Sequence, residues 1–75
     1  MTPEQFARVG RALHGPSWRR PLADDLDVRE RTIYRMEKGE TPIREGVVRD
    51  LAALCRAHSL ALAEIARELD PAAGQ

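Results

Sequence analysis

Apolar residues recur at helical spacing along most of the chain, and this pattern predicts an all-α fold. The first stripe consists of Phe6, Val9 and Leu13. Just before it, Thr2–Gln5 supplies a capping threonine, a proline at the first helical position and a glutamine that completes a capping box. We expect Gly15 and the proline after it to end this first helix.

Two short helices are predicted next, separated by a sharp turn. The second helix should begin at Ser17 or Trp18 and end at Leu26, with its proline in the first turn, where backbone N–H groups have no intrahelical partner. The third should run over 29–38 and end at Gly39. Between them lies Asp27, a residue type that tolerates a left-handed backbone. The expected buried positions are Leu22, Ala23, Leu26, Val28, Ile33 and Met36.

A fourth helix is predicted over 44–57, with Val47, Val48, Leu51, Leu54 and Cys55 on its apolar side. Ser59 could cap a fifth helix over 59–69, whose apolar residues are Leu60, Leu62, Ile65, Ala66 and Leu69. That stripe is longer than the core needs, so the helix either packs back on the domain or contacts a second subunit, and we favour a homodimer. Residues 1–70 are thus expected to form one domain of four to five helices, and residues 71–75 a flexible tail.

Composition narrows the possible classes of protein. A chain of 75 residues holds one domain and has little stability to spare. The formal net charge of zero counts against a protein that coats nucleic acid without sequence preference, since such proteins are strongly basic. It does not exclude a protein that recognises a specific sequence. No apolar run reaches the length of a membrane span and no signal-peptide pattern follows Met1, so we expect a cytoplasmic protein.

Candidate residues for metal binding or catalysis are few. Cys55 is the only cysteine, which excludes an intramolecular disulfide, and its apolar neighbours predict a buried structural thiol. His14 and His58 have no cysteine or carboxylate at ligand spacing, so we expect no metal and no cofactor. Asp24 and Asp25 are neighbours on a helix and point in different directions, which makes an acid–base pair improbable. We therefore do not expect an enzyme.

The segment 18–39 resembles the helix-turn-helix of the Cro/cI-like, or XRE, family of transcriptional regulators. The resemblance rests on the small Ala23, the turn residue Asp27, the apolar Ile33 and the terminating Gly39. Residues 40–43 resemble the loop that leads into that family's fourth helix, and the match covers about 2–57. Two residues depart from the family pattern: Asp27 stands where glycine is usual, and Arg29 stands where a capping serine or threonine is common. We expect a slightly strained turn and a weaker cap.

The resemblance implies a lambda-repressor-like DNA-binding domain and assigns roles to the polar residues. Base reading would fall to Glu30, Arg31 and Arg35, with Thr32 beside them. Arginine can bond guanine bidentately and glutamate can accept from cytosine, which favours a GC-containing half-site. Phosphate contacts would come first from Arg19, Arg29 and Arg44, and then from Arg20, Tyr34 and Lys38. Trp18 is expected to pack between helices, whereas Tyr34 could equally be a surface residue.

The expected function is sequence-specific binding of double-stranded DNA by a transcriptional regulator. The partner would be a palindromic operator, bound by a homodimer. The size favours a repressor of a phage, prophage or mobile-element operon. Two alternatives stay open. One is an antitoxin-type protein that also binds a partner protein through the C-terminal helix, and the other is a protein-interaction module on the same scaffold.

Overall fold

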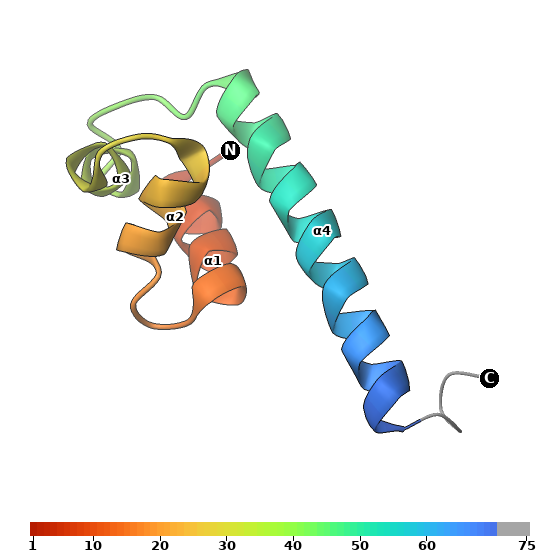
Figure 1. Ribbon diagram of the computed structural model, residues 1–75. Coiled ribbons are helices and arrows are strands. Elements are labelled where there is room, and N and C mark those ends of the chain that lie inside the picture. Colours follow the sequence, from red (N-terminus) through yellow and green to blue (C-terminus); the bar gives the residue numbers. More distant parts are fainter. Residues whose placement is uncertain (71–75) are drawn as a thin grey trace.

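The computed structural model describes residues 1–70, and within them it contains four helices and no strand. They are α1 (Pro3–His14), α2 (Arg19–Leu26), α3 (Glu30–Glu37) and α4 (Glu45–Leu69). Helices α1, α2 and α3 form a compact body, and α4 runs along one side of it and extends past its end (Figure 1). The predicted all-α class is confirmed. The predicted tail, residues 71–75, lies outside the described residues.

The start of α1 follows the capping-box prediction. The Thr2 hydroxyl accepts a hydrogen bond from the backbone N–H of Gln5 at 3.1 Å, and the Gln5 side chain accepts one from the backbone N–H of Thr2 at 2.9 Å. Two donors that a helix start leaves without partners are thereby satisfied. The helix ends at Gly15, whose φ of 79° lies in the region that favours glycine.

The core is small and is built where the helices of the body meet one another and the first half of α4. Its buried residues are Phe6, Ala7, Trp18, Leu22, Ala23, Ile33, Met36 and Leu51. Trp18 is 1% exposed and stands edge-on to Phe6, with ring centroids 5.8 Å apart. The prediction that Trp18 packs between helices is confirmed. The small Ala23 is 3% exposed and belongs to this core, so the prediction that it is buried is confirmed.

The turn between α2 and α3 depends on a left-handed Asp27, with φ 55° and ψ 45°. The N–H of Val28 donates to the carbonyl of Ala23 at 3.0 Å, which is the bond that closes a Schellman motif. Gly39 ends α3 in the same manner, with a φ of 78° and a bond from the N–H of Glu40 to the carbonyl of Arg35. Both predicted chain reversals are confirmed.

Several predicted helix bounds were wrong by one or two residues. α2 begins at Arg19, because Trp18 is its N-cap. α3 spans Glu30–Glu37, with Arg29 as N-cap and Lys38 as C-cap. α4 begins after the N-cap Arg44. Cap residues stand half inside a helix, so sequence patterns place them on either side of its end.

The predicted fifth helix is wrong, because residues 59–69 continue α4 without a break. No glycine or proline lies between 47 and 69. Every residue of this stretch therefore keeps its backbone N–H donor, and none has the extra backbone freedom of glycine. Ser59 is therefore an interior residue of α4 and not a cap. The continuous helix stretches the described structure to 48 Å along its longest axis, against 23 and 21 Å along the others.

The two halves of α4 lie in different surroundings. Leu51 is buried and Leu54, Cys55 and His58 are half-buried against the body, whereas every residue from Ser59 to Asp70 is exposed. Cys55 is therefore less buried than predicted. Helical periodicity also places Leu60 on the opposite side of α4 from Leu62, so Leu60 does not belong to the predicted stripe. None of the helices within residues 1–70 is long and apolar enough to cross a membrane.

Candidate nucleic-acid interface

Helix α3 has a buried side and a cationic side. Ile33 is fully buried and Met36 is 5% exposed, so these two residues fix the rotation of the helix on the body. Arg31, Arg35 and Lys38 are all exposed, and the periodicity of a helix places them together on the side opposite Ile33 and Met36. Of the other predicted base-reading residues, Glu30 is exposed at the start of α3 and Thr32 is half-buried.

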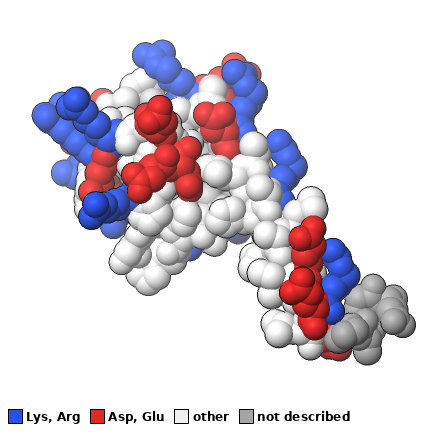
Figure 2. Space-filling model, viewed as in Figure 1, with Lys and Arg blue, Asp and Glu red and all other residues white. Residues whose placement is uncertain are grey.

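Charge is unevenly distributed over the body, although the chain as a whole is neutral. Figure 2 shows lysine and arginine side chains gathered at the end of the body where α3 lies. Acidic side chains lie nearer the centre of this view, between that end and α4. The formal neutrality therefore conceals a locally cationic surface around α3.

Arg19 joins the start of α2 to the end of α3. Its Nε and Nη2 donate to the two carboxylate oxygens of Glu37 at 2.6 and 2.7 Å. The guanidinium carbon also lies 4.8 Å from the ring centroid of Trp18 and 5.2 Å from that of Tyr34. This bidentate geometry, together with the flanking rings, fixes the guanidinium in one orientation.

The hydrogen bond from Arg19 lowers the pKa of Glu37 below its ordinary value, although partial burial acts in the opposite direction. The positive charges of Arg19, Arg11 and Lys38 lower it further. The same bond raises the pKa of Arg19. Sequence spacing gave no signal for this pair, because its two members are 18 residues apart on different helices.

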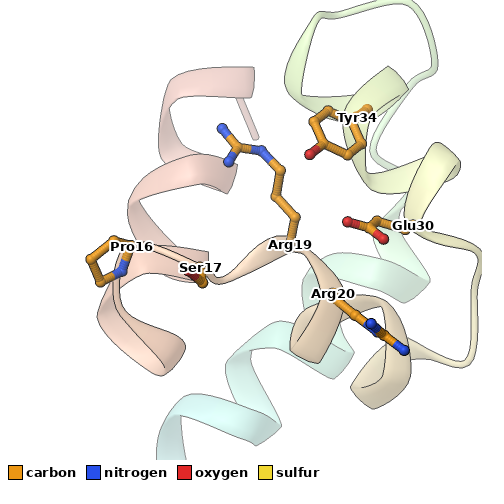
Figure 3. A pocket seen from close by; sticks show the side chains of 6 residues that line it. All are labelled: Pro16, Ser17, Arg19, Arg20, Glu30 and Tyr34. Atoms are coloured by element: carbon orange, nitrogen blue, oxygen red, sulfur yellow. The ribbon is translucent and has the colours of Figure 1, made fainter.

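A polar hollow of about 270 Å³ lies beside this pair, at the start of α2. It is lined by Pro16, Ser17, Arg19, Arg20, Glu30 and Tyr34. In Figure 3, Arg19 and Arg20 extend in different directions from the first turn of α2, and Glu30 and Tyr34 face them from α3. Predicted base-reading and phosphate residues from two helices therefore line the same hollow.

Arginine stands at the start of three of the four helices. Arg19 is the first residue of α2, Arg29 is the N-cap of α3 and Arg44 is the N-cap of α4. None of these three starts has a side-chain capping hydrogen bond, whereas α1 has a full capping box. The weak cap predicted at Arg29 is thus present. A helix start carries partial positive charge, which Glu30 and Glu45 in the first turns of α3 and α4 partly offset, whereas the first turn of α2 holds no acidic residue.

His14 has partners that sequence spacing did not reveal. Its Nε2 lies 2.6 Å from an Asp25 carboxylate oxygen, and its ring stands edge-on to His58, with centroids 5.7 Å apart. These contacts tie the end of α1 to α2 and to the middle of α4. Within residues 1–70, no three His, Cys, Asp or Glu side chains form a group that could hold a metal ion.

The predicted site residues thus fall into two groups. The first group is exposed and lies on α3 or at the starts of helices; its members are Arg20, Arg29, Glu30, Arg31, Arg35, Lys38 and Arg44. Tyr34, at 43% exposure, belongs with them. Thr32 and Arg19 are half-buried, and Arg19 is bonded to Glu37. No protein-family model, curated protein or solved structure was found to match this chain.

Proposed function

We propose that this chain is a sequence-specific, double-stranded-DNA-binding transcriptional regulator. In this proposal α2, the turn at Asp27 and α3 act as a helix-turn-helix, and α3 enters the major groove. The observation that carries the proposal is the two-sided character of α3. Ile33 and Met36 anchor it, while Arg31 and Arg35 extend from its opposite side into solvent.

Base reading is assigned to the residues that α3 presents outward. Arg31 and Arg35 are four residues apart and so project from the same side of the helix. Each can bond the O6 and N7 atoms of a guanine, and Glu30 can accept from the N4 amine of a cytosine. Thr32 stands at the edge of this surface. The proposed half-site therefore contains G·C pairs.

Phosphate binding is assigned to the helix starts. The cations at Arg29 and Arg44 add to the partial positive charge of helix ends that no side chain caps. A DNA phosphate can accept bonds from the backbone N–H groups at these helix starts and from the neighbouring guanidinium groups. Arg20, Tyr34 and Lys38 extend the same surface. Arg19 uses two N–H donors on Glu37 and keeps three more for a phosphate.

The proposed mode of action is occupation of an operator. A two-fold operator presents two half-sites to a symmetric dimer, and binding there excludes competing proteins. Repression follows most directly from such binding, because it needs no further activity from the domain.

The experiment is a selection of bound fragments from random duplex DNA, followed by titration at several salt concentrations. We expect an enriched GC-containing motif and an affinity that falls as salt rises. A double substitution, Arg31→Ala with Arg35→Ala, should abolish the enrichment. The matched control is Arg56→Ala with Arg67→Ala, which removes the same charge from exposed positions on α4. Absence of DNA affinity at low salt would overturn the proposal and favour a protein-interaction module.

A further inference from the structure

The C-terminal half of α4 bears an apolar stripe that nothing covers within residues 1–70. Its members are Leu62, Ile65 and Leu69, which are 65%, 49% and 82% exposed. We call these three residues the open stripe. They continue the face of α4 that Leu51 buries against the body at 1% exposure. The positions 51, 55, 58, 62, 65 and 69 alternate in steps of four and three, which is the spacing of a coiled-coil seam.

Small residues and Glu68 flank the open stripe, and no charged residue stands within it. Ala61 and Ala66 lie on either side of it, which allows a second helix to approach closely. By helical periodicity, Glu64 and Arg67 lie on the far side of α4. Figure 2 shows largely uncharged surface where the body and α4 diverge. An apolar partner would therefore meet no buried charge along this face.

A hollow lies at the base of the open stripe, where α4 leaves the body. It measures about 270 Å³ and is lined by Ala12, Leu13, Cys55, His58, Ser59 and Leu62. Its wall is mainly apolar, and Leu62 belongs both to the hollow and to the open stripe. Each molecule thus carries an apolar helix end at Leu69 and, seven to fourteen residues back along α4, an apolar recess beside the same helix.

We propose that residues 58–69 of α4 pair in antiparallel orientation with the same segment of a second copy of this chain. In this register Leu62 of one copy lies beside Ile65 of the other. Leu69 then lies beside His58 of the other copy and enters the hollow there. The arrangement has two-fold symmetry, so every contact occurs twice.

The position of the body selects the antiparallel orientation. The body covers the stripe face of α4 up to His58. In a parallel pair the two bodies would therefore lie at the same end of the paired helices and clash. An antiparallel pair places each body beyond the C-terminal end of the other copy's helix. The register is also set, since sliding the helices further together would push Leu69 into the body, and sliding them apart would expose Leu62 again.

The flanking residues fit this register. Glu68 of one copy lies across from Ala61 of the other, and Ser59 lies across from Ala66, so no like charges face each other. The contact covers about a dozen residues per copy and is smaller than the roughly 800 Å² per partner of a standard interface. We therefore expect a reversible dimer with a dissociation constant on the order of micromolar. The pairing does not depend on DNA binding.

The test is sedimentation of the full chain, without DNA, over a concentration range from micromolar to millimolar. The wild type should shift from monomer to dimer, and Leu62→Glu should remain a monomer. Leu60→Glu is the matched control, because Leu60 is 61% exposed on the opposite side of α4, and it should dimerise like the wild type. Equal helix content by circular dichroism in dilute samples would show that both variants are folded.

A monomeric wild type at millimolar concentration would overturn the proposal, and so would equal loss of dimer in the two variants. A wild type that stays monomeric but is captured through Leu62 by a different protein would also overturn it. Because these measurements contain no DNA, their failure would leave the proposed DNA binding untouched.

Orientation is tested by oxidative cross-linking in a Cys55→Ser background. His58→Cys combined with Leu69→Cys should form disulfide-linked dimers, because the two positions face each other. Leu69→Cys alone should not, since the two copies of that position would lie about 16 Å apart along the helices. Efficient cross-linking of Leu69→Cys alone would show a parallel pair and overturn the antiparallel arrangement.

Discussion

The indole of Trp18 lies directly against Gly10 of α1. A Cβ atom placed on Gly10 would stand 2.1 Å from Cε3 of Trp18 and 2.5 Å from Cδ2. The ring is confined on its other sides, because it also lies against the buried Phe6 and the guanidinium of Arg19. A glycine that costs α1 some helix stability is therefore what allows the tryptophan to join the first two helices.

Substitution of this glycine should destabilise the protein. Gly10→Ala should lower the free energy of unfolding by about 1–3 kcal/mol, because overpacking outweighs the gain in helix propensity. Gly46→Ala is the control, since a Cβ there would have only the end of the Arg49 side chain within 4 Å, at 3.9 Å. That variant should be neutral or slightly more stable. Urea denaturation measures both, and a stable Gly10→Ala variant would contradict the packing described here.

Acid should weaken the contact between Arg19 and Glu37. Folding lowers the pKa of Glu37, so the pair stabilises the fold at pH values above 4.5, the ordinary pKa of this group. This contribution is lost as the pH falls through the lower pKa of the folded state. Glu37→Gln should therefore lower the melting temperature at pH 7 and have a smaller effect near pH 3. Thermal melts between these values provide the test. A difference from wild type that stays constant with pH would contradict the assignment.

Neighbouring arginines should differ in their effect on stability. Arg19→Ala removes two charge-assisted hydrogen bonds and the contacts with Trp18 and Tyr34, so the melting temperature should fall. Arg20→Ala removes an exposed side chain of the same type and should leave the melting temperature nearly unchanged. Equal melting temperatures for the two variants would show that the pair with Glu37 contributes nothing.

Base-reading and phosphate-binding residues should respond differently to DNA sequence and salt. Arg35→Ala should weaken binding to the selected motif by about 1–3 kcal/mol and relax base preference at one position. Arg44→Ala should weaken binding to all sequences alike and reduce the salt slope by about 1. Fluorescence anisotropy on the selected and a scrambled duplex separates the two outcomes. Identical behaviour of the variants on both duplexes would contradict the proposed roles.

The left-handed turn residue should accept glycine and reject a branched side chain. Asp27→Val should destabilise the fold by about 1–2 kcal/mol, because a β-branched residue is strongly disfavoured at a φ of 55°. Asp27→Gly should be tolerated, since glycine adopts this backbone without strain. Chemical denaturation measures both changes. Equal stability of the two variants would show that the turn relaxes to another conformation.

The local elements of this protein follow from the sequence by itself. Helix starts and ends depend on residues close together in the chain, so the Thr2–Gln5 capping box and the turns at Asp27 and Gly39 could be predicted. The alternation of apolar and polar residues likewise identified Ile33 and Met36 as the buried side of α3 and left Arg31 and Arg35 outside. These features depend on interactions within a few residues, which a sequence pattern records directly.

Contacts between distant residues were decided only by the tertiary structure. The pairs Arg19–Glu37 and His14–Asp25 form because separate helices bring their side chains together, and no local spacing records that. The continuity of α4 past Ser59 was missed for a related reason. A serine can cap a helix or continue one. Here α4 begins at Glu45, is held by packing against the body, and continues through Ser59.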